Sequence, residues 1–197
     1  MKKLFILPLL LISVSTFAQT SIGVETQAYP AGIIPGIRID LGLTDYLNLT
    51  SRIGYNFADR RDWGKHDNEE GGGPGFGLGI ERTGFLTENL SIHARTDLWF
   101  MDIDWRDPYT GPALCGALPC PDETGTSEIT ILQSTVGLSY FIPISDRFFI
   151  KPSLSFGYEI NAKTKGEEVG EGAILLVGFQ FGRYLKLHNE ALYSSYA

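Results

Sequence analysis

The feature that most constrains this chain is a two-residue alternation of apolar and polar side chains. In residues 47–57 the odd positions are mostly apolar, as at Leu49 and Ile53, whereas the even positions are polar or glycine, as at Arg52. Successive side chains of a β-strand point to opposite faces, so this segment predicts a strand with one apolar and one polar face. Residues 148–161 repeat the pattern, although Pro152 removes one backbone donor from that strand.

Six further segments alternate in the same way, which raises the expected number of strands to eight: 22–29, 33–41, 75–81, 90–98, 132–140 and 175–182. The chain also has 23 glycines and 12% aromatic residues, a mixture that favours closely paired strands over helices. The fold class expected from these patterns is all-β, in one domain.

The N-terminal 18 residues have the features of a signal peptide. Lys2 and Lys3 are followed by a nearly continuous apolar run at 4–11 and by small residues that end at Ala18. The run is shorter than the roughly 20 residues that a membrane-spanning helix needs. We expect export and a mature chain that begins near Gln19, with an uncleaved leader as the alternative.

The connections between the expected strands alternate in length. Those at 44–46, 86–89 and 144–146 are tight, whereas 59–72, 107–126 and 162–170 are long and polar. Outer-membrane barrels have short periplasmic turns, longer outer loops and an even number of strands that alternate apolar-out and polar-in. No later window holds 18 consecutive apolar residues, which excludes a helical membrane protein. A soluble β-sandwich would show similar alternation and stays open as an alternative.

The polar face carries charges of both signs. A barrel of eight strands is too narrow for an open channel, so inward charges must be paired and hydrogen-bonded. The expected lumen network, which would plug the barrel, consists of Glu25, Arg38, Asp40, Arg52, Glu81, His93, Arg95, Asp97, Lys151 and Glu159. The alternative is that these residues form the solvated face of an open sheet.

The leader, the eight alternating segments and the unequal connections resemble small eight-stranded outer-membrane proteins of the OmpA and OmpX type. The resemblance covers about residues 20–187 and implies an antiparallel up-and-down transmembrane β-barrel at 19–187, followed by a C-terminal tail at 188–197. It also implies the outer membrane of a Gram-negative cell as location, with outer-membrane lipid and the barrel assembly machinery as partners. Such barrels usually finish on a terminal aromatic strand residue, whereas here Phe181 and Tyr184 precede a tail that ends in Ala197.

The fifth expected strand changes phase at its end. Trp99, Met101 and Ile103 alternate with Asp102 and Asp104, which reverses the order of apolar and polar positions. We expect either a β-bulge near Trp99 or a strand that leaves the membrane there.

Two cysteines, Cys115 and Cys120, lie in the 107–126 connection. An exported chain with an even number of cysteines favours a disulfide between them. The closed loop is short, so its stabilising effect is expected to be small. A pair of metal-binding thiols is the alternative, but no histidine lies nearby.

The 59–72 connection is rich in charge. His66 with Asp67 and Glu69 or Glu70 forms a conceivable cation site, but the spacing matches no established ligand pattern, so we expect a solvated loop and no bound metal or cofactor. The net charge of −7 without a basic stripe argues against nucleic acid as a partner.

Catalysis has little support in the sequence. A lipid-modifying acyltransferase or deacylase would need a histidine with a serine or an acid near the outer leaflet. His93 lies at same-face spacing from Ser91 and Asp97, yet a satisfied polar network is the stronger interpretation. The expected function is a non-enzymatic outer-membrane barrel with a structural or surface role. A membrane-embedded lipid-modifying enzyme and a soluble secreted binding barrel remain the alternatives.

Overall fold

The computed structural model describes residues 18–61, 64–109 and 120–185, and these residues form strands and their connections. None of the described residues belongs to a helix that is long and apolar enough to cross a membrane. The strands are β1 (Ala18–Tyr29), β2 (Gly32–Gly42), β3 (Leu47–Asp59), β4 (Asn68–Arg82), β5 (Leu90–Asp107), β6 (Glu123–Tyr140), β7 (Ile142–Pro143), β8 (Phe148–Lys165) and β9 (Gly172–Leu185).

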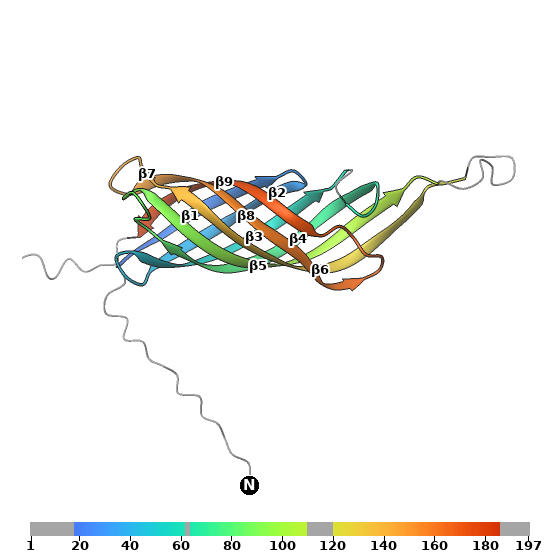
Figure 1. Ribbon diagram of the computed structural model, residues 1–197, viewed down its shortest axis with the longest axis horizontal. Helices are drawn as coiled ribbons and strands as arrows, with labels where there is room; N and C mark the ends of the chain where they lie inside the picture. Colours follow the sequence, from blue (N-terminus) through green and yellow to red (C-terminus); the bar gives the residue numbers. More distant parts are fainter. Residues whose placement is uncertain (1–17, 62–63, 110–119, 186–197) are drawn as a thin grey trace, which may run out of the picture.

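The strands close into one antiparallel barrel (Figure 1). Strands β1 to β6 pair in chain order, β6 pairs with β8, and β9 pairs with both β8 and β1. The two-residue β7 only adds to the end of β8. The barrel therefore has eight strands, and the all-β, eight-stranded antiparallel fold that the sequence predicts is confirmed.

The connections give the barrel two different ends. Connections 43–46, 83–89 and 141–147 lie at one end, which we call the turn end, where β1 begins and β9 stops (left in Figure 1). Connections 60–67, 108–122 and 166–171 lie at the opposite end, which we call the loop end. These three are shorter than expected, because the adjoining strands continue into segments that the sequence suggested were loops.

The first connection at the loop end departs from the expected pattern. Only Pro30 and Ala31 separate β1 from β2, so this hairpin is much lower than its neighbours. In contrast, the β5–β6 hairpin projects well beyond the rest of the barrel (right in Figure 1). The rim of the loop end is therefore uneven.

The distribution of side chains is the reverse of that in a soluble protein. On β3, the apolar Ile53 points outward and is 73% exposed, whereas the neighbouring Arg52 points inward and is 2% exposed. The same arrangement recurs round the barrel, with Val24, Leu78 and Val136 exposed on the outside. The two faces predicted from the alternation are thus an apolar exterior and a charged interior.

The phase change in β5 has a different cause from a bulge. Its pairing with β6 runs without a shift from Leu90–Tyr140 to Asp107–Glu123, so the bulge expected near Trp99 is wrong. Trp99 continues the inward face of the strand and is fully buried, and Asp102 on the outer face is exposed. Toward the loop end the interior therefore becomes apolar while the exterior becomes polar.

Candidate functional site in the barrel interior

The interior contains two groups of side chains with opposite chemistry. Toward the turn end lies the ionic cluster, formed by Glu25, Arg38, Asp40, Arg52, Glu81, Arg95, Asp97 and Lys151. Toward the loop end lies the apolar cluster, formed by Tyr29, Ile34, Ala58, Trp99, Met101, Ile103, Ile129, Ile131, Val169, Ile174 and Leu176. The ten polar residues proposed from sequence are all buried; His93 lies beside the ionic cluster and Glu159 beside the apolar one.

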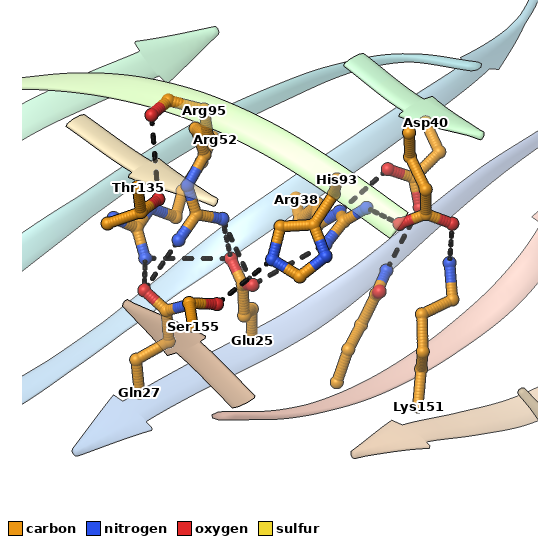
Figure 2. Close-up of polar contacts among 12 residues, drawn as sticks. Glu25, Gln27, Arg38, Asp40, Arg52, His93, Arg95, Thr135, Lys151 and Ser155 are labelled. Carbon is orange, nitrogen blue, oxygen red and sulfur yellow. Dashed lines mark hydrogen bonds and ion pairs between the residues drawn. The ribbon is translucent and has the colours of Figure 1, made fainter. Parts of the chain in front are cut away.

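Glu25 occupies the centre of the ionic cluster. Figure 2 shows its carboxylate between the guanidinium of Arg38 on one side and those of Arg52 and Arg95 on the other. Arg95 Nη1 donates to both carboxylate oxygens, at 3.1 and 2.9 Å. Arg52 and Arg95 each donate to Gln27 Oε1 at 2.5 Å. One acid and one amide therefore connect three arginines that come from three different strands.

Asp97 completes this arginine pair from the opposite side. Its Oδ2 lies 2.9 Å from Arg52 Nη2 and accepts a hydrogen bond from Arg95 Nε at 3.0 Å. The geometry follows from register, because Arg95 and Asp97 are next inward neighbours on β5. The carboxylate thus fixes both guanidinium groups, and Asp97 is not available to act with His93.

A second part of the ionic cluster lies closer to the turn end. Arg38 Nε donates to Asp40 Oδ1 at 2.7 Å, and its Nη2 donates to Glu81 Oε2 at 2.5 Å. Lys151 Nζ donates to the other oxygen of Glu81 at 2.7 Å and lies 5.6 Å from the ring centre of Phe149. Each carboxylate oxygen of Glu81 therefore accepts a hydrogen bond from a positively charged side chain.

A polar cavity of about 220 Å³ gives access to this part of the cluster from the turn end. Asp40, Glu81 and Lys151 line its inner part, and the turn residues Asp45 and Glu88 line its mouth. The volume accommodates several water molecules. We conclude that the turn-end part of the ionic cluster can be hydrated, whereas the Arg52–Arg95 part is enclosed by side chains.

The charges of the ionic cluster balance. Four acids, Glu25, Asp40, Glu81 and Asp97, face four cations, Arg38, Arg52, Arg95 and Lys151. Removing a charge from water costs several kcal/mol, and only close pairing with satisfied hydrogen bonds offsets that cost. The cluster fulfils this condition through its shared carboxylates, which join side chains of β1, β2, β3, β4, β5 and β8 across the interior.

His93 contacts a serine rather than an acid. Its Nε2 lies 2.9 Å from Ser155 Oγ on β8, and its Nδ1 has no hydrogen-bond partner among the described residues. A serine activated by histidine also requires a group that orients the other ring nitrogen. Neither Ser91 nor Asp97, the same-face neighbours of His93, contacts its ring, so the described residues contain no triad around it.

Trp99 forms the boundary between the two clusters. Its ring lies 5.0 Å from the guanidinium carbon of Arg52, and its Nε1 donates to Gln133 Oε1 at 2.9 Å. Gln133 in turn donates to Glu159 at 3.2 Å, and Arg60 donates to the other Glu159 oxygen at 3.1 Å. A chain of polar contacts therefore passes along the apolar cluster to the loop end.

Glu69 binds the loop-end connections together. Its carboxylate accepts hydrogen bonds from the backbone N–H groups of Lys65, His66 and Gly170 at 2.7–3.1 Å and lies 3.5 Å from Arg60 Nη1. The residue is fully buried on β4, so its placement in a solvated loop is wrong. Asp67 and Glu70 do not join it, and the described residues contain no group of three or more potential metal ligands.

Contacts with Asp107 and Glu168 also hold the connection before β4 in place. His66 Nδ1 lies 2.6 Å from Asp107 Oδ2, and the Asp67 N–H donates to the other oxygen of Asp107 at 2.9 Å. The bonds from His66 and from the Asp67 backbone lower the pKa of Asp107 from its ordinary value. Lys65 donates to Glu168, which raises the pKa of Lys65 and lowers that of Glu168.

Sequence reasoning missed several members of these networks. Gln27 and Gln133 lie on the expected inward faces, but their role as bridges between charged residues depends on strand register. Arg60 and Glu69 fell within an expected loop, and no local signal showed that they would point inward. The cysteine pair cannot be assessed, because Cys115 lies outside the described residues and the disulfide to Cys120 stays a prediction.

Comparisons with known proteins give structural likenesses only. No protein-family model matches the chain, and no curated protein sequence matches it. The N-terminal β-barrel domain of Pseudomonas aeruginosa OprF is 17% identical, with a TM-score of 0.42, over 83% of this chain and 96% of that one. Neisserial surface protein A is 12% identical with a TM-score of 0.44, over 84% and 94% of the two chains. A major outer membrane protein from Thermus thermophilus is 11% identical with a TM-score of 0.48, over 84% and 99%.

Proposed function

We propose that this protein is an integral outer-membrane β-barrel whose lumen is closed by its own side chains and whose loop end has a structural or surface-interaction role. The inverted distribution of side chains is the observation that carries this proposal. Charged residues such as Arg52 are buried inside, while large apolar residues such as Ile53, Phe156 and Val177 are exposed outside. Soluble monomers seldom expose continuous apolar surface on this scale, whereas lipid hydrocarbon requires it.

The closed lumen is supported by the contents of the barrel. The ionic cluster and the apolar cluster follow one another along the axis, and Glu81, Trp99 and Gln133, which bonds to Trp99, are fully buried. A solute would have to separate several charge-assisted hydrogen bonds to pass, and each is among the stronger interactions in proteins. A passive channel is therefore not the proposed activity.

A surface role is supported by the β5–β6 hairpin, which extends past the barrel rim (Figure 1). Outward side chains on β5 change from Phe100 to Asp102 and Asp104, which marks the end of the apolar exterior. Beyond that level the described part of the hairpin exposes polar side chains, including Arg106, Glu123 and Thr124. This hairpin is the part of the described chain best placed to meet molecules outside the membrane.

Export through a cleaved signal peptide and insertion by the barrel assembly machinery belong to the same proposal. Residues 1–17 lie outside the described residues, so cleavage before Gln19 is tested by N-terminal sequencing of the purified protein. The enzymatic alternative has no supporting observation, because the apolar cluster is filled by its own side chains and His93 lacks an orienting acid.

The proposal is tested by folding with and without an amphiphile. We expect the mature chain to fold in phospholipid vesicles or detergent micelles, seen as resistance to protease and to unfolding by dodecyl sulfate at room temperature. In plain buffer we expect aggregation, because the exterior would expose apolar side chains to water. Reversible folding in plain buffer would reject the membrane assignment and favour a soluble binding barrel.

A further inference from the structure

The wall of the barrel is interrupted beside β9 at the loop end. The ladder between β1 and β9 ends at the pair Ala28–Val177, but β9 continues to Gly172, where it still pairs with β8. Residues 172–176 therefore have β8 on one side and no registered β1 partner on the other. We call this opening the β9 gap.

The stagger of the strands explains the gap. Extending the β1–β9 register places Ala173 opposite position 32, but β1 has already ended at Tyr29 and position 32 begins β2. The β1–β2 hairpin, which turns at Pro30 and Ala31, thus ends before it reaches the level of residues 172–176 and leaves that edge of β9 uncovered. Arg60 covers only its far end, where Nη1 donates to the carbonyl oxygen of Gly170 at 2.5 Å.

A cavity of about 250 Å³ occupies the β9 gap. Its lining combines outward side chains, including Phe156 and Leu175, with inward ones, including Tyr29 and Ile174. A cavity with both kinds of lining passes through the wall instead of lying on one face. It connects the apolar exterior with the edge of the apolar cluster, to which Tyr29 and Ile174 belong.

The charges and the backbone groups around the β9 gap indicate which kind of ligand it can bind. Glu159 and Glu171 line the cavity, and Arg60 is already engaged by Glu159 and by Gly170, so a phosphate or carboxylate would meet excess negative charge. The unregistered edge of β9 has the N–H and C=O groups of any strand edge, and its N–H donors need acceptors wherever water is scarce. A hydrocarbon chain with a neutral carbonyl at its head satisfies both conditions.

We propose that the β9 gap binds one acyl chain of a membrane lipid, with the ester or amide carbonyl at the edge of β9 and the hydrocarbon directed toward Tyr29 and Ile174. This inference rests on the proposed membrane function and goes beyond it by assigning a lateral lipid site. The cavity is smaller than the usual 300–1,000 Å³ of sites that enclose a drug-sized ligand, so it holds part of a chain and not a whole lipid.

The test uses a phosphatidylcholine that carries a photoreactive diazirine in one acyl chain. The mature protein is folded into vesicles that contain this probe, irradiated and digested, and the crosslinked residues are mapped by mass spectrometry. Outward residues of any membrane barrel contact lipid, so crosslinks to Val177 are expected whether or not the gap binds lipid. The β9 gap additionally predicts crosslinks to the inward-facing Tyr29 and Ile174.

A matched pair of variants separates the gap from the rest of the exterior. Ala173→Trp places an indole at the opening of the gap, whereas Ala28→Trp places the same group on the neighbouring strand where the β1–β9 ladder is intact. We expect Ala173→Trp to lower crosslinking of Tyr29 and Ile174 by about tenfold, because the cavity is small enough for one side chain to fill it. Crosslinking in Ala28→Trp should match the unmodified protein.

Three results would overturn the proposal. Crosslinks confined to outward residues in an inserted protein would reject the lipid site and leave the membrane assignment standing. Failure of the protein to insert into vesicles would reject the proposed function, and the lipid site with it. The variant Leu175→Cys tests for a second copy of the chain at the gap. If it forms a disulfide-linked dimer on oxidation in vesicles, and the lipid crosslinks to Tyr29 and Ile174 are missing, the gap binds a second copy of the chain.

Discussion

The ionic cluster and the apolar cluster occupy one interior and share strands β1, β2, β3 and β5, but their side chains have opposite chemistry. On β5, Arg95 and Asp97 belong to the ionic cluster, and Trp99 and Met101, the next two inward residues, belong to the apolar one. The ionic cluster lies where the exterior is apolar; its Arg52–Arg95 part is enclosed by side chains, whereas its turn-end part borders a cavity that can hold water. The apolar cluster extends to the level of Asp102, where the exterior is polar again.

This difference shows that the surroundings of a barrel segment determine how much stability a substitution in its interior removes. In the ionic cluster Glu25, Glu81 and Asp97 each have two or more cationic partners and Asp40 pairs with Arg38, so the loss of one shared side chain leaves several charges unbalanced. The apolar cluster resembles the core of a soluble β-protein, where a lost side chain leaves only a cavity. Substitutions in the two clusters should therefore differ in size and in their response to charge.

The largest effect is expected for Arg95→Glu. The substitution removes a guanidinium shared by Glu25, Gln27 and Asp97 and adds a carboxylate beside two others. Breaking a buried ion pair costs about 3–5 kcal/mol, so the free energy of unfolding should fall by at least that amount. Urea titration in phospholipid vesicles, followed by tryptophan fluorescence, measures the change.

Lys65→Glu provides the control for charge reversal. The Lys65 side chain is exposed and pairs with the exposed Glu168, so the same titration should give a curve close to that of the unmodified protein. Equal losses of stability in the two variants would show that Arg95 is not in an enclosed network.

The second effect concerns the apolar cluster. Ile103→Ala removes a fully buried side chain and leaves a cavity, which typically costs about 2–5 kcal/mol. The outward Ile53→Ala should cost much less, because lipid chains can fill the space that its side chain leaves. Comparing the two unfolding curves in vesicles tests this. An Ile53→Ala loss as large as that of Ile103→Ala would mean that the exterior is a packed protein core.

The sequence assigned the residues of the ionic cluster to one face because period-two alternation identifies residues that share a face. Glu25, Arg52 and Asp97 were placed on one interior for that reason. Alternation alone does not distinguish a bulge from a change of surroundings, so the sequence left a bulge near Trp99 and a strand that leaves the membrane as alternatives, and the unshifted register of β5 and β6 excludes the bulge. The gap beside β9 was also beyond prediction, since it depends on the register between the first and last strands, which only closure of the barrel establishes.

A third, smaller effect probes what surrounds the ionic cluster. Leu154 points outward from β8 and is 53% exposed, while its neighbour Ser155 points inward and contacts His93. An arginine on the lipid face costs about 2–4 kcal/mol at the bilayer midplane and nearly nothing at the interface. We expect Leu154→Arg to lower the free energy of unfolding within that range in vesicles.

Bilayer thickness gives this prediction its control. In vesicles of short-chain lipids the Leu154→Arg side chain reaches the interface more easily, so the loss should shrink. Ser155→Arg acts by crowding the ionic cluster, and its loss should not depend on lipid chain length. The same dependence in both variants would contradict the assignment of opposite faces.

The smallest effect is expected at the loop end, outside both clusters, where a single carboxylate reports on the connection before β4. The hydrogen bond from His66 and that from the Asp67 N–H favour the charged form of Asp107 and lower its pKa below the ordinary 3.8. A lowered pKa in the folded state means that the stabilising contribution is complete above the unfolded value. The contribution is lost only as the pH falls through the lowered value.

The Asp67 amide proton, observed by nuclear magnetic resonance in micelles, should therefore titrate with a midpoint below 3.8. His66→Ala removes the larger of the two causes and should move the midpoint up toward 3.8 without changing the urea curve of the barrel. If the midpoint stays unchanged in His66→Ala, the imidazole does not bind Asp107, and the connection before β4 is held by Glu69, by the Asp67 N–H and by the Lys65–Glu168 ion pair.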